Sequence, residues 1–149
     1  MAAVGMHCLL EIYGCPRELL DDAEHVRKSL RAAAEFAGAT WLGEAHHRFE
    51  PCGVTAVGLL AESHISLHSW PEIGYAAVDV FTCGDIAMPD KACQKLVELM
   101  QADRHTLARI PRATELLPRE VAGVDTQEAH MSETAEESPR LRHEVLAGE

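Results

Sequence analysis

The residues best suited to chemistry gather in one short stretch, Ala61 to Glu72, which reads Ala-Glu-Ser-His-Ile-Ser-Leu-His-Ser-Trp-Pro-Glu. It combines a serine hydroxyl, imidazoles and carboxylates, which proteins use as nucleophiles, proton carriers and hydrogen-bond acceptors. From Ile65 onward apolar and polar residues alternate, and this period of two predicts a half-buried strand. Pro71 cannot donate to a strand ladder, so it ends the strand near the rim of a sheet. We expect a reaction centre on the polar face of this strand.

Two familiar kinds of site fit this stretch poorly. His64 and His68 have the spacing of a helical zinc site, but in a strand their Cα atoms lie roughly 13 Å apart, too far for one ion. We therefore expect no metal. Ser63 lacks the Gly-x-Ser-x-Gly turn of a serine hydrolase. Spacing alone supports only a serine, a histidine and a thiol, that of Cys83, at neighbouring strand ends.

Composition limits the classes of protein that remain. The chain has 149 residues, 47% of them hydrophobic, which predicts one ordinary folded domain with its own core. Its net charge of -11 argues against a nucleic-acid partner and suits a cationic small molecule. Five cysteines without a CxxC pair indicate reduced thiols. The sequence shows neither a signal peptide nor a membrane span, so we expect a cytoplasmic protein with no membrane partner.

Periodicity and chain breakers predict an α+β fold. Beside the stretch described above, the expected strands cover residues 6–13, 40–49, 54–60, 75–83 and 105–111. One helix is expected between an Asp21 cap and Gly38, and a second begins at Pro89. This order predicts a two-layer α/β sandwich, with an antiparallel sheet and helices on one face. The other face is best covered by a second copy of the sheet, so we expect a homodimer that builds a larger sandwich.

The composition changes near residue 118. Residues 118–149 contain eight acidic and three basic residues and no regular apolar period. Such a segment cannot bury enough apolar surface to order itself, so we expect a solvated, disordered tail. The sequence thus predicts one domain over residues 1–117 and an acidic tail over residues 118–149.

Three segments carry a resemblance to a known family. They are Phe49-x-Pro-x-Gly-Val-Thr, the stretch Ala61 to Glu72, and Gly-Tyr-Ala-Ala-Val-Asp-Val-Phe-Thr-Cys-Gly ending at Gly84. Together they resemble the prokaryotic S-adenosylmethionine decarboxylase family, and the likeness covers nearly all of residues 5–112. The resemblance implies a zymogen, a proenzyme that cleaves itself between Glu62 and Ser63 and needs no external cofactor.

The resemblance also implies roles for individual residues. Ser63 would become a pyruvoyl group, which forms a Schiff base with the substrate amine and accepts the electrons left by CO₂. His68 matches the histidine that moves protons during processing, and Thr55 stands where relatives commonly carry a serine linked to processing. Cys83 matches the residue that protonates the decarboxylated carbanion. Each protomer would consist of two chains after cleavage.

By the same resemblance, Phe49 stacks on adenine and Glu72 accepts hydrogen bonds from the ribose diol. Trp70 is a candidate for the pocket wall, where its ring favours the sulfonium cation. The implied enzyme is a carboxy-lyase that converts S-adenosylmethionine into the aminopropyl donor of spermidine biosynthesis, with release of CO₂.

Two alternatives stay open. One is a pyruvoyl-dependent decarboxylase of ornithine or arginine, and the other is an unprocessed binding or regulatory subunit. The chain departs from many relatives by having Gly5-Met6-His7 where they have Gly-Arg-His, and by its long acidic extension. Phe49 and Glu72 favour the nucleoside substrate, because a small basic amino acid offers neither an adenine nor a diol.

Overall fold

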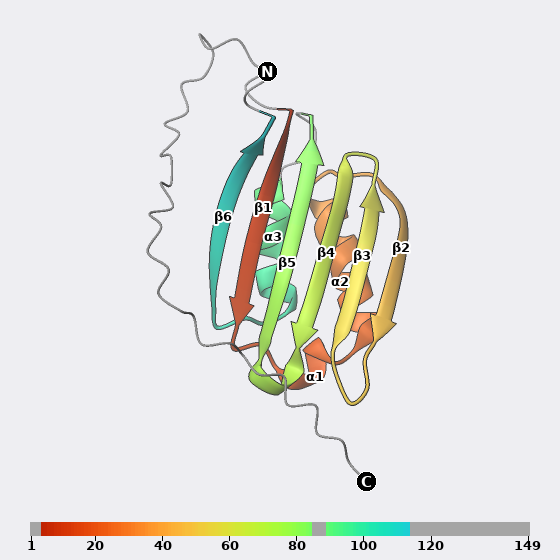
Figure 1. Ribbon diagram of the computed structural model, residues 1–149, viewed down its shortest axis with the longest axis vertical. Coiled ribbons are helices and arrows are strands. Elements are labelled where there is room, and N and C mark those ends of the chain that lie inside the picture. The colour runs from red at the N-terminus through yellow and green to blue at the C-terminus, as the bar shows by residue number, and fades with distance from the viewer. Residues whose placement is uncertain (1–3, 85–88, 114–149) are drawn as a thin grey trace, which may run out of the picture.

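A computed structural model of the chain describes residues 4–84 and 89–113. It contains one six-stranded sheet with its helices on one face (Figure 1). The strands are β1 (Gly5–Tyr13), β2 (Trp41–Arg48), β3 (Val54–Leu60), β4 (Ser63–Trp70), β5 (Tyr75–Cys83) and β6 (Arg104–Arg112). The helices are α1 (Arg17–Leu20), α2 (Ala23–Phe36) and α3 (Pro89–Leu99), with a 3-10 turn, η1 (Pro71–Ile73), after β4. The predicted α+β class with a two-layer arrangement is confirmed.

The strands lie in the order β2-β3-β4-β5-β1-β6, and every neighbouring pair is antiparallel. The four strands from β2 to β5 form the expected series of hairpins. β1 instead lies between β5 and β6, so it pairs with two strands that are far away in the sequence. The first strand thus lies inside the open sheet and joins β6 to the other strands (Figure 1).

The core lies between the sheet and the two longer helices. α2 packs on β2, β3 and β4, and α3 packs on β1 and β5. Ile65 and Leu67 of β4 are both 0% exposed on this side. Their burial fixes the register of β4, because a shift by one residue would turn both side chains out of the core. His64, Ser66 and His68, which alternate with them, consequently face away from the helices, whereas Ser69 is buried on the helix side and donates to the carbonyl of Leu20 in α1.

Several details differ from the sequence prediction. The cap of α2 is Asp22, whose side chain accepts hydrogen bonds from the backbone of Glu24 and His25, and not Asp21. The short helix α1 was not expected, and β6 has nine residues, more than predicted. At Gly58 of β3, a Cβ would lie 2.4 Å from the ring of Trp41, so the glycine makes room for that side chain.

The sheet face opposite the helices has no covering element among the described residues (Figure 1). Large apolar side chains are exposed there, including Val57, Leu59, Trp70 and Ile110. The predicted tail over residues 118–149 lies outside the described residues. Within the part of the chain that the structure describes, no helix is long and apolar enough to cross a membrane.

Candidate active site

The carbonyl of Glu62 is held from two directions at one end of the sheet. The backbone N–H of Cys83 donates to it at 2.9 Å, and the Cys83 thiol donates to it at 3.1 Å. The side chain of Glu62 in turn accepts the backbone N–H of Thr40 at 3.0 Å. A carbonyl with two donors is polarised, and it is ready to carry negative charge if a nucleophile attacks it. The sequence expectation that Ser63 and Cys83 meet at one rim is confirmed by the register, which pairs Ser63 with Thr82.

Ser63 has an unusual backbone conformation. Its φ angle is 146°, a value that residues with a side chain rarely adopt. Such a conformation costs on the order of 1–3 kcal/mol and persists only where the surrounding structure enforces it. Here the enforcement comes from β4 pairing on one side and from the two hydrogen bonds to the Glu62 carbonyl on the other. The Glu62–Ser63 junction therefore combines a strained backbone at Ser63 with a polarised carbonyl at Glu62.

The Ser63 hydroxyl has a partner that the sequence reasoning did not assign. Its Oγ lies 3.2 Å from Nδ1 of His64. The sequence pattern relates His64 only to a metal site, which its spacing in a strand fits poorly. No pattern of spacing signals this contact, because consecutive strand residues normally point to opposite faces.

At the other end of β4, a cavity of about 300 Å³ opens on the sheet face that lacks helices. It is lined by Phe49, Cys52, Gly53, Thr55, His68, Ser69, Trp70 and Glu72. All the substrate-binding residues expected from the sequence line this cavity. So do His68 and Thr55, whose Nδ1 and Oγ1 atoms lie 2.9 Å apart across β3 and β4.

The cavity has an aromatic rim and an acidic group. Phe49 is 46% exposed and makes an edge contact with His47, and Trp70 stacks on Tyr75 with ring centroids 5.2 Å apart. The exposed carboxylate of Glu72 accepts a hydrogen bond from Cys52 at 3.4 Å. Burial, with Glu72 nearby, raises the pKa of the Cys52 thiol, so this thiol stays protonated as a donor. Cys52 is a pocket residue that the sequence reasoning did not single out.

The loop that carries Phe49 is held by Asp21. The Asp21 carboxylate accepts the backbone N–H of Gly53 at 3.0 Å and pairs with Arg48 at 3.1 Å. These two contacts lower the pKa of Asp21, the Gly53 hydrogen bond having the larger effect. Gly53 has φ of 107°, and a Cβ there would lie 3.1 Å from the backbone oxygen of Ser69. The loop therefore requires both the glycine and the carboxylate.

The structure does not bring all the predicted catalytic residues together within one chain. Ser63 and Cys83 lie at one end of the sheet, and Thr55 and His68 lie toward the other. His68 lies five positions after Ser63 in β4, which corresponds to roughly 16 Å along the strand. A histidine at that distance cannot exchange a proton with Ser63 of its own chain.

Three other thiols, those of Cys8, Cys15 and Cys93, are buried. Burial raises the pKa of Cys8 and of Cys15 to about 11, with Asp90 and Asp103 adding to the effect. Burial also raises the pKa of Cys93. These three thiols stay protonated at neutral pH and are poor nucleophiles. Cys83 is exposed, so it is the thiol best placed for chemistry at the sheet end.

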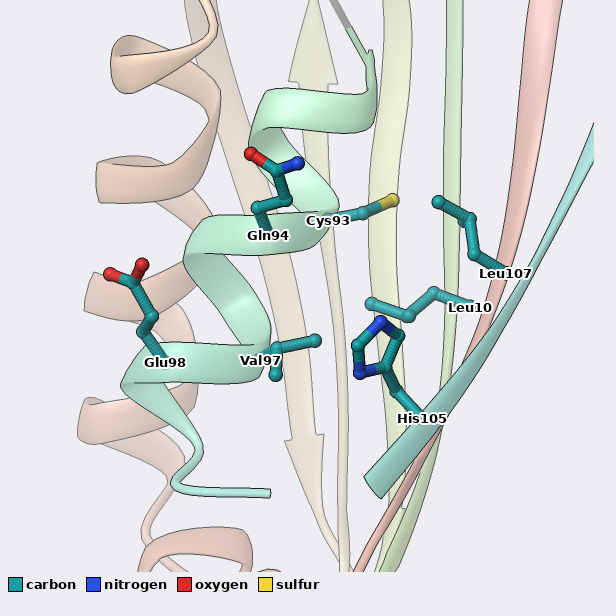
Figure 2. Close-up of a pocket in the computed structure, with 7 residues that line it drawn as sticks. All are labelled: Leu10, Cys93, Gln94, Val97, Glu98, His105 and Leu107. Carbon is teal, nitrogen blue, oxygen red and sulfur yellow. The ribbon is translucent and has the colours of Figure 1, made fainter. Parts of the chain in front are cut away.

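A second cavity, of about 230 Å³, lies on the helix side between α3 and strands β1 and β6. Figure 2 shows Leu10, Leu107 and His105 pointing toward it from the strands, with Cys93 and Val97 facing them from α3. Its wall is mainly apolar, and none of the residues predicted from the sequence to take part in chemistry lines it. We therefore assign the candidate active site to the opposite face.

Comparison with known proteins shows the family of the chain. The family model described as S-adenosylmethionine decarboxylase matches residues 6–113. A protein of a Synechococcus species named S-adenosylmethionine decarboxylase proenzyme is 57% identical over 111 residues, which is 74% of this chain and 87% of that protein. A protein of the same name from Caldicellulosiruptor saccharolyticus is 41% identical over 124 residues, 83% of this chain and 100% of that one.

A solved structure gives the same result. The crystal structure of the adenosylmethionine decarboxylase from Aquifex aeolicus superposes with a TM-score of 0.70 at 36% identity. The match covers 75% of this chain and 92% of the other. The matched segment contains both ends of the sheet described above, together with every residue assigned to them. The chain therefore belongs to the S-adenosylmethionine decarboxylase family.

Proposed function

We propose that this chain is the proenzyme of a pyruvoyl-dependent S-adenosylmethionine decarboxylase, a carboxy-lyase whose product serves spermidine biosynthesis. The observation that carries the proposal is the geometry around the Glu62 carbonyl. Two donors from Cys83 polarise it, and the next residue carries a hydroxyl on a strained backbone. These are the requirements for attack by Ser63 on its own preceding peptide bond, which converts the amide into an ester.

The residues present fit a pyruvoyl group at position 63. Serine is the residue from which elimination leaves such a group. Ser63 is also the first residue of β4, so cleavage before it leaves the strand intact. A pyruvoyl group supplies a carbonyl that takes up the electrons released with CO₂. Cys83 remains beside position 63 after cleavage, and its exposed thiol is available to deliver a proton to the substrate carbon.

We propose a homodimer because one chain alone separates the two parts of the site. His68 and Thr55 lie roughly 16 Å along the strand from Ser63. A twofold axis that crosses the uncovered face near Ser66, midway between positions 63 and 68, sets Ser63 of one subunit opposite His68 of the partner subunit. The same packing buries the exposed apolar side chains of this face, such as Val57 and Leu59.

The cavity supports S-adenosylmethionine as the substrate. Phe49 offers an exposed ring for the adenine, and Glu72 offers carboxylate oxygens for the two ribose hydroxyls. The Trp70 ring at the rim can attract the sulfonium cation. In the proposed dimer, the substrate then extends from the cavity of one subunit to Ser63 of the other. The acidic net charge of the chain also favours a cationic substrate.

Intact-mass measurement of the purified protein tests the proposal. We expect two chains, residues 1–62 and a blocked chain that begins at position 63, whereas Ser63→Ala stays whole. CO₂ release is then measured with S-adenosylmethionine, ornithine and arginine. Release from S-adenosylmethionine alone is expected. A wild-type chain that stays whole after long incubation contradicts self-processing, and release from only ornithine or arginine contradicts the substrate.

A further inference from the structure

The Ser63 hydroxyl lies beside an imidazole of its own chain. The distance from Ser63 Oγ to His64 Nδ1 is 3.2 Å, within hydrogen-bonding range. In a regular strand these side chains would point to opposite faces. The φ of 146° at Ser63 departs from strand geometry at this one residue, and it allows the contact. The strain that marks the cleavage site thus also gives the nucleophile a neighbouring base.

Resting on the self-processing function proposed above, we propose that His64 is the base that takes up the Ser63 hydroxyl proton when the peptide bond is attacked. The proton moves from Oγ to Nδ1 as Oγ bonds to the Glu62 carbonyl carbon. The resulting oxyanion is held by the two Cys83 donors. Nδ1 then returns the proton to the Ser63 nitrogen as the C–N bond breaks, which leaves an ester and a free amine.

The surroundings of His64 suit this role. Its ring makes edge contacts with Phe81 and with His7, at centroid distances of 6.0 and 6.2 Å. These rings hold the imidazole in place on the sheet face, and a positioned base needs little reorganisation when the reaction begins. On the neighbouring strand β3, His64 pairs with Leu59, whose side chain is uncharged.

The charged groups near His64 are already engaged with each other. Nε2 of His7 lies 3.1 Å from the Asp79 carboxylate, and its Nδ1 lies 3.3 Å from the Arg112 guanidinium. Because a guanidinium only donates, Nδ1 of His7 accepts and Nε2 carries the proton toward Asp79. Both nitrogens of His7 are therefore occupied, and His64 alone contacts the Ser63 hydroxyl among the described residues.

This assignment divides the work between two histidines of the same strand. His64 acts within its own chain on the attack step. His68, which lies too far from Ser63 of its own chain, is left for proton transfer across the proposed dimer in the later elimination. The two steps can be separated experimentally, because hydroxylamine cleaves an ester directly and releases residues 1–62 without any elimination.

The test is the rate at which freshly made proenzyme releases residues 1–62 in hydroxylamine, followed by intact mass. Wild type is compared with His64→Gln, which can hydrogen-bond but cannot take up a proton, and with His64→Ala. His46→Gln serves as the matched control, because His46 is exposed on β2. We expect both His64 variants to be slower by about a hundredfold or more, as for loss of a general base, and the control to match wild type. Added imidazole is expected to accelerate His64→Ala.

Three other results would contradict the role proposed for His64. Release from His64→Gln at the wild-type rate would overturn the role as a base and leave self-processing intact. A slow His64→Ala that imidazole does not accelerate would also overturn it, since the loss would then be structural. If wild type itself releases no fragment with or without hydroxylamine, the proposed self-processing fails, and the role of His64 fails with it.

Discussion

The two ends of the sheet are built by different means. We call Glu62, Ser63, His64 and Cys83 the cleavage end, and the cavity around Phe49, Thr55, His68, Trp70 and Glu72 the binding end. At the cleavage end, two of the main features belong to the backbone: the Cys83 N–H donates to the Glu62 carbonyl, and Ser63 has φ of 146°. At the binding end, side chains line an open cavity on a regular strand pair and its adjoining loop.

This contrast suggests which substitutions each end tolerates. Side-chain changes at the cleavage end leave the backbone donor and the strained conformation in place, so they slow the reaction without always abolishing it. Side-chain changes at the binding end remove the interaction itself. The same contrast underlies the proposed dimer, because the strained backbone at Ser63 and the His68–Thr55 pair lie toward opposite ends of β4.

The largest expected effect comes from His68. His68→Ala should slow release of residues 1–62, measured without hydroxylamine, by about 10²–10⁴-fold, the range for loss of a positioned acid or base. Co-expression with Ser63→Ala sharpens the comparison. A mixed dimer then has one site with Ser63 from one chain and His68 from the other, and the His68→Ala chains in such dimers should be cleaved. If the mixed dimers stay whole while wild type is cleaved, each chain builds its own site and our dimer is wrong.

Local patterns predicted much of this arrangement. The alternation around Ile65 and the stop at Pro71 indicated β4, and the bounds predicted for residues 54–60 and 75–83 agree with β3 and β5. Burial of Ile65 and Leu67 follows from the same period of two. These features depend on neighbouring residues and on the core, so a single sequence contains them.

Other features depend on parts of the chain that meet only after folding. The position of β1 between β5 and β6 requires pairing with distant residues, such as His7 with Phe81 and with Ile110. Asp21 and Asp22 are adjacent carboxylates, and which one caps α2 is decided by the distant Gly53 N–H, which engages Asp21. The φ angle of Ser63 likewise has no signature in the sequence.

Cys83→Ala is expected to have the next largest effect, and it tests whether backbone contacts dominate the cleavage end. The thiol is one of two donors to the Glu62 carbonyl, and the backbone N–H remains in the variant. A thiol is a weak donor, so we expect processing to slow by roughly tenfold. CO₂ release per processed chain should fall further, because the proposed proton donor is lost. Wild-type rates for both steps would mean that Cys83 serves neither.

At the binding end, Phe49→Ala should weaken substrate binding and leave processing unchanged. Stacking of an aromatic side chain on a base contributes about 1–3 kcal/mol, so we expect KM for S-adenosylmethionine to rise by roughly tenfold. Phe36→Ala is the matched control, since Phe36 is an aromatic residue 57% exposed at the end of α2. Slower release of residues 1–62 from Phe49→Ala would show that Phe49 also takes part in processing, contrary to the substrate-binding role that we propose for it.

The smallest expected effect concerns Asp21, which holds the loop of the binding end. The Gly53 N–H and Arg48 lower the pKa of Asp21 in the folded chain, relative to about 3.9 when unfolded. A lowered pKa means that the ionised carboxylate favours the folded state. This contribution is present above about pH 4 and is lost as the pH falls through the folded-state pKa. Asp21→Asn should therefore lower the urea midpoint at pH 7, and the difference from wild type should shrink progressively below pH 4.

Glu35→Gln, which breaks an exposed ion pair with Arg31 on α2, controls for the loss of one surface carboxylate. The urea midpoints of Asp21→Asn and wild type could instead differ by the same amount from pH 7 to pH 3. That result would mean that the negative charge of Asp21 does not stabilise the loop.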